Sequence, residues 1–442
     1  MDDLIRQFDN VGARVSTDTP HDYSTDFGQL VHRVPRVVVR ATCEDHVVDT
    51  LRTTRRLRLP VAVRGAGHSC FGQTVTDGVL LVNVPDGSVA PRMLGDGLVE
   101  VPARLHWREV EAFLNPRGRS VPALADYLDL SVGGTLSVGG YGADSIVHGA
   151  QTDHVDRIRL ITPDGAAIWC SSQENAELFS YALAGLGQVG VIETAVLRTV
   201  PYRAFTTLFN YRYSSLKELV ASIEWIAESA NDRPLLFKAH CARGRFVSTY
   251  GIQTENVRNA ISARRFPPVR VQRAAHAWIV PKYRQWRSLV VKLWVAQFSN
   301  HGRLWTDFLF DYDGLESFTT FLQPLLERDA FAGCLKSIYI VAIRRLPRTT
   351  RFPLEASDST GASMSFGIGL YSMIPRQDPA LVGAVAETVA FCLEKCIALG
   401  GRPYRYGWHQ LDEHHYQALY GATYDRLLAL RRELDPDGLF QR

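Results

Sequence analysis

The sequence predicts an α+β protein with more than one compact unit, and three observations support this expectation. The chain has 442 residues, which is more than a single hydrophobic core usually organises. Residues 30–66 alternate a short apolar run, a helical segment and a second apolar run. Residues 202–375 contain several strand-like segments separated by helical ones, a pattern typical of a sheet covered by helices.

Composition and charge narrow the possible partners. The chain is 46% hydrophobic and 21% charged, as in ordinary globular proteins. Its 49 basic and 46 acidic residues give a net charge of +3, and no basic run predicts binding to nucleic acid or to an anionic membrane. The N-terminus does not resemble a secretory signal, and no apolar stretch reaches the roughly 18 residues of a membrane span. We therefore expect a cytoplasmic protein, either a monomer or a homodimer.

The seven cysteines are expected to be free thiols. Their odd number and wide spacing do not fit a disulfide framework. Cys392 and Cys396 lie four residues apart in a segment with helical periodicity, and no second Cys or His pair follows at the spacing of a zinc site. Buried thiols explain the pair better than a metal, so we expect no metal site.

The first 200 residues favour short strands with a few helices between them. The apolar and β-branched runs predict strands at 36–41, 60–65, 78–85 and 190–200, and a β-rich stretch at 155–170 with a turn at 163–165. Residues 95–122 are expected to form a strand, a helix and a turn. Helices are expected at 43–57, where acids come early and arginines late as the helix dipole prefers, and at 174–185.

The pattern of strand-like and helical segments changes after Pro201. Strands are expected at 205–213, 246–254, 303–312, 336–346 and 363–373. Helices are expected at 216–229, 314–329 and 379–400. An aromatic-rich link at 402–420 then leads to a terminal helix.

Residues 185–190 read GLGQVG, the glycine pattern of dinucleotide-binding turns. Such a site needs a strand before the glycines and a helix after them, so that the helix N-terminus meets a pyrophosphate. Here a helical segment comes first and a β-branched strand follows. We therefore interpret these residues as a helix cap and a tight turn, which can still lie against a ligand.

Residues 122–151 contain six glycines, with Ser131, Thr135, Ser137 and Ser145 between them. This composition does not fit a conventional helix or a well-packed strand. It lets backbone N–H groups and hydroxyls approach a large ligand closely. Apolar residues recur throughout the segment, which indicates order. We therefore expect ligand contact here, and a flexible surface loop is the alternative.

Two side chains in glycine-rich surroundings are candidates for chemistry. His68 is the single histidine of the turn VRGAGHSCFGQ at 63–73, where the backbone offers little to shield it. Asp126 lies between apolar neighbours just ahead of the glycines of 122–151. A carboxylate there is either destabilised by desolvation or has its pKa raised into the range useful for accepting a proton. A helix or turn cap is an equally compatible role.

Together these segments resemble the cytokinin dehydrogenases, within the vanillyl-alcohol-oxidase or berberine-bridge type of covalent flavoproteins. Four blocks carry the resemblance in the family's order, at 26–47, 64–73, 125–151 and 175–195. The motifs G-H-S-x-x-G-Q and D-Y-L-x-L-S-V-G-G-T-L-S are a specific pair, and the match is almost continuous over the first 200 residues. It is faint in the second domain, around 301–318, and returns in part at 403–408 and 435–440.

The resemblance implies a two-part FAD-binding domain of the vanillyl-alcohol-oxidase type and an α+β substrate domain with an antiparallel sheet. The implied division is an FAD-binding part at 1–200, a substrate domain at 201–395 and a C-terminal segment at 396–442 that returns to the FAD domain. FAD is the implied cofactor, attached covalently through His68. The other implied FAD-binding residues are Arg64, Gly65, Ala66, Gly67, Ser69, Gln73, Asp126, Ser131, Gly133, Gly134, Ser137, Tyr141, Gly190, Ile192 and Tyr406.

The resemblance also favours Asp126 as the catalytic base. In the implied reaction a hydride passes from a C–N or C–O carbon of a small organic substrate to flavin N5, while Asp126 accepts the proton of the neighbouring N–H or O–H. The electrons then pass to O2 or to a quinone-like acceptor, and the sequence does not distinguish these.

Two positions depart from the family pattern. Bicovalent relatives also attach the flavin through a cysteine, and Tyr127 stands at the matching place, so attachment through His68 alone is expected. The cytokinin dehydrogenases carry a glutamate-glycine pair that helps to bind the purine, whereas Tyr250 precedes Gly251 here. The substrate is therefore either a cytokinin or an intermediate of a natural-product pathway. A redox-inactive flavin-binding or ligand-binding protein is the alternative from another class, and the presence of both His68 and Asp126 argues against it.

Residues 412–415, DEHH, are expected to begin a solvated helix. Adjacent histidines do not share one helix face at the spacing of metal ligands. The aromatic residues between 404 and 420 are either core residues or neighbours of the flavin.

Overall fold

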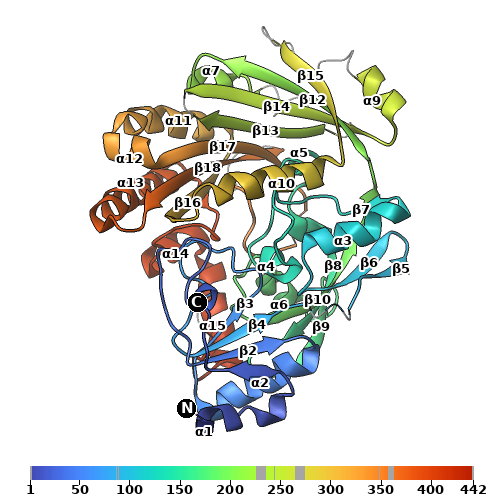
Figure 1. Cartoon of the computed structure of the whole chain (residues 1–442), viewed down its shortest axis with the longest axis vertical. Helices are drawn as coiled ribbons and strands as arrows, with labels where there is room; N and C mark the ends of the chain where they lie inside the picture. Colours follow the sequence, from blue (N-terminus) through green and yellow to red (C-terminus); the bar gives the residue numbers. More distant parts are fainter. Residues whose placement is uncertain are drawn as a thin grey trace.

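The helices and strands of the computed structural model fall into two bodies (Figure 1), and the structure describes residues 2–85, 87, 89–224, 235–242, 244–263, 274–347, 349–356 and 363–440. The first body holds most residues before Pro201 and forms the lower half of Figure 1. The second body contains an eight-stranded sheet and forms the upper half. Helices and strands are mixed in both bodies, which confirms the predicted α+β class.

The predicted strand–helix–strand unit begins the first body and forms a mainly parallel sheet. β4 lies between β2 and β3 and is parallel to both, and β1 pairs with β2 antiparallel at the edge. Val47 and Leu51 of α2 pack with buried valines of the strands. The elements are α1 (Asp2–Arg6), β1 (Arg14–Ser16), β2 (Val37–Ala41), α2 (Glu44–Leu57), β3 (Val61–Arg64) and β4 (Val79–Asn83).

A second sheet of the first body has five antiparallel strands in the order β5-β6-β10-β8-β9. The GLGQVG turn lies between α6 and β10, so a helix precedes the glycines and a strand follows them, as predicted. The elements are β5 (Arg92–Gly95), β6 (Leu98–Pro102), α3 (Trp107–Leu114), β8 (Val155–Ile161), β9 (Ala167–Ser171), α6 (Ala176–Ala182) and β10 (Val191–Arg198). A short pair, β7 (Arg119–Ser120) and β11 (Val200–Pro201), lies near the passage to the second body.

The glycine-rich segment 122–151 is ordered and contains two short helices, α4 (Val132–Leu136) and α5 (Ser145–His148). The expectation that no conventional helix forms there is therefore wrong at α4 and α5. Gly133 explains the difference, because its missing side chain lets α4 pack closely on the first body. A Cβ at Gly133 would lie 3.1 Å from the Cβ of Ala103 and 3.3 Å from the carbonyl oxygen of Ile192.

The second body is built on an antiparallel sheet with the order β15-β12-β14-β13-β17-β18-β16-β19. Five of these strands were predicted from the sequence, whereas β13, β15 and the two-residue β19 were missed, as was helix α10 (Tyr283–Ala296) between β15 and β16. The strands are β12 (Phe205–Tyr213), β13 (Leu235–Ala242), β14 (Arg245–Thr254), β15 (Ala274–Pro281), β16 (His301–Phe310), β17 (Leu335–Arg344), β18 (Met364–Pro375) and β19 (Arg402–Pro403).

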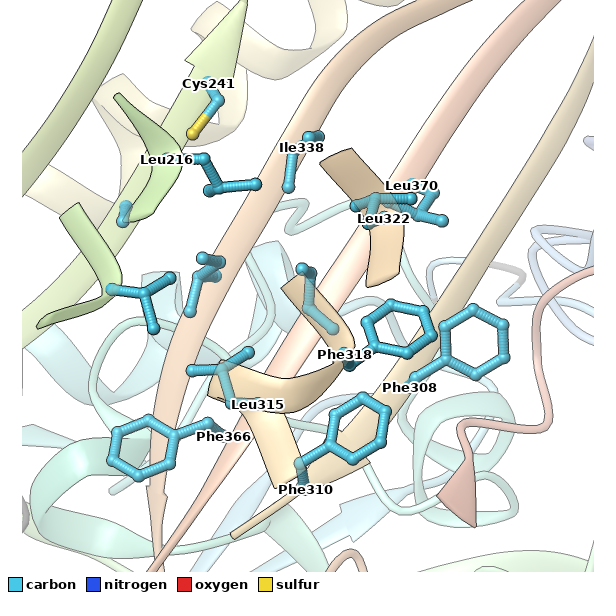
Figure 2. Packing of buried hydrophobic residues seen from close by; sticks show 14 of the residues in the cluster. Leu216, Cys241, Phe308, Phe310, Leu315, Phe318, Leu322, Ile338, Phe366 and Leu370 are labelled. Carbon is cyan, nitrogen blue, oxygen red and sulfur yellow. The ribbon is translucent and has the colours of Figure 1, made fainter. Parts of the chain in front are cut away.

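Helices cover both faces of this sheet. Helices α7, α11, α12 and α13 (Pro379–Ala398) enclose the main core, in which the ring of Phe318 lies about 5 Å from those of Phe308 and Phe310 (Figure 2). Helices α5 and α10 lie on the opposite side, toward the first body (Figure 1). The remaining bounds are α7 (Leu216–Ala221), α9 (Val257–Ala263), α10 (Tyr283–Ala296), α11 (Tyr312–Leu322) and α12 (Asp329–Cys334).

Two predicted helices differ in length from the observed ones. The helix expected at 314–329 is α11, which ends at Leu322 and continues as a 3-10 turn. The helix expected at 216–229 corresponds to α7 up to Ala221, and residues 225–229 lie outside the described residues.

The chain returns to the first body after β19. Leu427 and Leu430 of α15 pack in a core cluster with Trp107, and Phe440 pairs with Val61 of β3. The expected boundary at residue 396 falls inside α13, and we keep the three-part division as a proposal. The last elements are α13 (Pro379–Ala398), α14 (Glu413–Tyr420) and α15 (Ala422–Leu434).

Two smaller expectations concern α13 and α14. Cys392 and Cys396 are buried on α13 as free thiols. Asp412 caps α14, so residues 412–415 begin a helix as predicted. Over the described ranges, no cluster of His, Cys, Asp and Glu side chains could hold a metal ion. In the same ranges the structure has no helix long and apolar enough to cross a membrane.

Candidate functional site

A cavity of about 480 Å³ lies where the two bodies meet. This volume is typical of a pocket for a cofactor or small molecule. Segments far apart in the sequence form its walls, including the turn at 65–69, the segment 125–141, the turn at 186–192 and residues 404–406. The second body adds α10, β13, β16, β17 and β18.

The cavity brings together nearly all the site residues predicted from the sequence. Arg64 is the exception, because it does not line the cavity. Its guanidinium donates a hydrogen bond to the carbonyl of Thr25 at 2.7 Å and lies against Gly67 of the turn. The residues that line the cavity are Gly65, Ala66, Gly67, His68, Ser69, Gln73, Asp126, Ser131, Gly133, Gly134, Ser137, Tyr141, Gly190, Ile192 and Tyr406. Their individual roles stay predictions.

The turn at 65–69 needs glycine at two positions. Gly67 has φ = 69°, and a Cβ there would lie 2.3 Å from a terminal nitrogen of Arg64. A Cβ on Gly65 would lie 2.1 Å from the hydroxyl oxygen of Ser131. That hydroxyl also accepts a hydrogen bond from the backbone N–H of Ala66 at 3.3 Å. The two motifs that carry the family resemblance therefore touch each other, and bare backbone faces the cavity between them.

His68 lies between two aromatic rings at one end of the cavity. Its ring stacks on Phe27 with centroids 3.8 Å apart and on Tyr127 with centroids 5.1 Å apart. Burial, together with the charge of Arg303, lowers the pKa of His68 to about 3. Within the described part of the chain, neither ring nitrogen has a hydrogen-bond partner. His68 is thus a neutral imidazole with a lone pair available, which a nucleophile requires.

Asp126 is held in a cationic environment. Its Oδ2 atom accepts hydrogen bonds from Nε of Arg287 at 2.8 Å and from the hydroxyl of Tyr339 at 3.3 Å, and Nζ of Lys238 lies 3.9 Å away. Burial raises the pKa of Asp126, but the charges of Arg287 and Lys238 outweigh burial and hold the pKa below its usual value. Of the alternatives that the sequence left open for this carboxylate, the raised pKa is therefore wrong, because two cations from distant segments lie beside it.

The other carboxylate oxygen of Asp126 remains available. Every hydrogen bond and ion pair of this side chain within the described ranges is made by Oδ2. The side chain keeps 19% of its surface exposed, and it lines the cavity. Oδ1 can therefore accept a hydrogen bond from a ligand N–H or O–H.

A second carboxylate, Asp307 of β16, lies in the cavity wall and was missed in the sequence. It accepts hydrogen bonds from the hydroxyls of Tyr406 at 2.8 Å, Tyr371 at 3.2 Å and Tyr141 at 3.3 Å. Burial raises the pKa of Asp307 to about 6, although the three phenols oppose this rise. The carboxylate of Asp307 thus holds the hydroxyls of three tyrosines that come from three separate segments of the chain.

Large side chains of the second body complete the wall near Asp126. Trp305 of β16 stacks on Tyr371 with ring centroids 4.4 Å apart, and its ring lies 6.5 Å from that of His68. Helix α10 contributes Val290, Val291 and Trp294. Periodicity in residues 283–296 was the one signal that could have located this helix, and no local motif marks Arg287 or Trp294.

The residues present fit FAD. Four buried polar atoms on cavity-lining residues have no hydrogen-bond partner in the described structure, namely Asn83 Oδ1, Arg104 Nε, Trp305 Nε1 and Arg405 Nη1. Unpaired buried polar atoms are costly, and a ligand with phosphates, hydroxyls and ring nitrogens can pair them. The glycine-lined backbone and the apolar rings offer the remaining surface that such a ligand needs.

Tyr127 and Tyr250, the two residues that depart from the family pattern, lie in different surroundings. Tyr127 lines the cavity and stacks on His68. Tyr250 of β14 is buried in the core of the second body and does not line the cavity. Residues of the neighbouring strand, β13, approach the cavity instead, with His240 in its wall and Lys238 beside Asp126.

Comparisons with known proteins agree with the geometry. Residues 35–171 match a family described as FAD binding domain. The uncharacterized oxidoreductase ORF5 in the fasciation locus of Rhodococcoides fascians is 38% identical over 202 residues, which are 45% of this chain and 46% of that protein. Cytokinin dehydrogenase 4 of Oryza sativa subsp. japonica is 30% identical over 224 residues, 48% of this chain and 42% of that protein. The matched region thus spans less than half of each relative.

The solved structures extend the likeness to the whole fold. Xylooligosaccharide oxidase from Myceliophthora thermophila C1, solved in complex with xylobiose, superposes with a TM-score of 0.78. The superposition covers 99% of this chain and 97% of that one at 13% identity, so it supports the fold alone. The chain therefore has the fold of this oxidase and contains a segment that matches an FAD binding domain, and about half of it is similar to a cytokinin dehydrogenase.

Proposed function

We propose that the protein is an FAD-dependent oxidase or dehydrogenase whose flavin is bound covalently through His68 and whose base is Asp126. One observation carries the proposal. His68 and Asp126 lie at the same end of a cavity that has backbone-lined walls for a cofactor, since Tyr127, the residue after Asp126, stacks on the imidazole at 5.1 Å. The relatives named cytokinin dehydrogenase support redox chemistry on a small organic molecule.

Bound FAD would supply the two-electron acceptor for oxidation at a C–N or C–O carbon. The residues of the chain have separate tasks. The turn at 65–69 and the segment 131–137 hold the cofactor mainly through backbone and hydroxyl groups. Asp126 accepts the substrate proton at Oδ1 and orients the reacting carbon. Trp294, Trp305 and Val290 enclose the same end of the cavity and exclude water.

The neutral state of His68 supports covalent attachment. A protonated imidazole has no lone pair, and the pKa of about 3 keeps His68 unprotonated at any physiological pH. The adjacent rings of Phe27 and Tyr127 fix the plane of the imidazole. Among the described residues, no competing hydrogen bond occupies its nitrogens.

The experiment is acid precipitation of the purified yellow protein, followed by mass measurement of the peptide that contains His68. We expect the colour to stay with the precipitate and the peptide to gain the mass of FAD. A His68→Ala variant should release its flavin into the supernatant, and a His46→Ala variant should behave as wild type. Colour that leaves the wild-type precipitate completely would exclude covalent attachment, and a protein that never carries flavin would overturn the whole proposal.

A further inference from the structure

Arg287 of α10 uses only part of its guanidinium in the contact with Asp126. Nε donates the hydrogen bond to Oδ2 at 2.8 Å. Within the described ranges, neither terminal nitrogen has a hydrogen-bond partner, and the side chain lines the cavity with 20% of its surface exposed. The planar fork of an arginine matches a carboxylate, which it binds with two parallel hydrogen bonds.

Two cations, Arg287 and Lys238, face Oδ2 of Asp126. Lys238 also faces Asp144, which pairs with Arg284 at 2.9 Å. The two terminal nitrogens of Arg287 line the cavity without a partner in the described ranges, so an anionic group on the substrate would pair with them.

Asp126 and Arg287 each keep an unpaired polar group beside the ion pair that joins them, and both residues line the cavity. Oδ1 of Asp126 accepts a hydrogen bond, and the terminal nitrogens of Arg287 donate two. A ligand that satisfies both carries an N–H or O–H group on the carbon next to a carboxylate. The 2-amino acids and 2-hydroxy acids have this arrangement.

We propose that the substrate is a 2-amino or 2-hydroxy acid, with its carboxylate on Arg287 and its amino or hydroxyl group on Asp126. This inference rests on the proposed function and deepens it. Bound FAD would supply the acceptor for the hydride of the C–H bond, and Asp126 would accept the N–H or O–H proton, so that the product would be a 2-imino or 2-oxo acid. The side chain of the acid is apolar, because Val290, Val291 and Trp294 follow Arg287 on the cavity face of α10.

Lys238 gives the proposal a pH signature. Its amine is buried and faces Asp126, Asp144, Arg287 and the ring of Tyr283, with His240 next along β13 on the same side. Burial and the charge of Arg287 lower the pKa of Lys238 to about 7, against the opposing charges of Asp126 and Asp144. A bound anion favours the protonated amine and raises this pKa. Binding of an acid near pH 8 should therefore take up a proton, and the affinity should fall as the pH rises above about 7.

The test uses the flavin-loaded protein and isothermal titration calorimetry, so it does not depend on turnover. The probes are benzoate, 3-phenylpropionate and octanoate, each compared with its neutral amide, in two buffers that differ in ionisation enthalpy. We expect at least one acid to bind roughly tenfold or more tightly than its amide, the scale of a charge-assisted hydrogen bond. We also expect proton uptake for acids only.

Substitutions test whether Arg287 causes the preference for the acid over its amide. Arg287→Gln should abolish the preference for the acid, whereas Arg287→Lys, which keeps the charge without the fork, should keep a reduced preference. Lys292→Gln removes a mostly exposed charge from the same helix and should bind like wild type. Flavin content and the unfolding temperature show whether each variant is folded.

The outcomes separate this inference from the proposed function. If the protein carries flavin and binds no acid more tightly than its amide, the substrate class is wrong while the proposed function stands. An acid preference that survives in Arg287→Gln would also overturn the inference. A protein without flavin contradicts the proposed function itself.

Discussion

The two sides of the cavity are built in different ways. The cofactor side comes from short continuous segments, such as the turn at 65–69 and the segment 131–141, and it consists largely of backbone and small side chains. The substrate side consists of large side chains, including Arg287, Trp305 and Tyr371, which come from separate elements of the second body. A shared cofactor would constrain the residues of the cofactor side. On the substrate side, changes of single residues would be enough to fit different substrates.

The largest effect is expected from a substitution on the cofactor side. Gly67→Val places a β-branched residue at φ = 69° and pushes its Cβ to 2.3 Å from the guanidinium of Arg64. The turn that carries His68 must then move. We expect the variant to lose covalent flavin completely, as measured by absorbance of the denatured protein.

Gly383→Ala is the matched control, because a Cβ at Gly383 meets nothing within 4 Å on α13. The control should keep the flavin content of the wild type. A fully loaded Gly67→Val variant would show that the bare turn is not required for the cofactor.

The second largest effect is expected at Asp126, where the cofactor side meets the substrate side. Asp126→Asn keeps the size of the side chain and its hydrogen bond from Arg287, but it removes the base. Reduction of the flavin by substrate should slow by roughly a hundredfold or more, the scale of general base catalysis. Stopped-flow bleaching measures this rate, and the flavin content should stay unchanged. Unaltered reduction kinetics would remove Asp126 from its assigned role.

The difference between the two sides also explains what the sequence could predict. The residues predicted to bind FAD lie in motifs whose glycines and hydroxyls are close together in the chain, and fifteen of them line one cavity. The short strands of the first body have clear apolar patterns, and the same holds for most of the large sheet. Arg64 was included because it adjoins the glycine turn, and only the structure shows that it supports the turn from outside the cavity.

The substrate side could not be predicted in the same way. Arg287 and Lys238 are 161 and 112 positions from Asp126 in the chain, and each is an isolated charge in an otherwise unremarkable segment. A raised pKa was one of the alternatives left open for Asp126, and it is wrong for this reason. Apolar neighbours in the sequence predict desolvation but carry no information on cations that folding brings close. The glycine-rich helix α4 was missed because tertiary packing on Ala103 outweighs the low helix propensity of glycine.

The smallest expected effect tests where the substrate side ends. Tyr250 stands at the position where the cytokinin dehydrogenases carry a purine-binding glutamate, so the sequence alone places it in the substrate site. In the structure its ring packs on Phe237 and Tyr211, with centroids 5.1 and 5.6 Å apart, inside the core of the second body. Tyr250→Phe should therefore leave kcat and KM within about twofold of wild type and change the free energy of unfolding by about 1 kcal/mol at most. Steady-state kinetics with any substrate found by flavin bleaching measures this. A KM that rises tenfold would place Tyr250 on the substrate side and return β14, instead of β13 and α10, to the centre of substrate recognition.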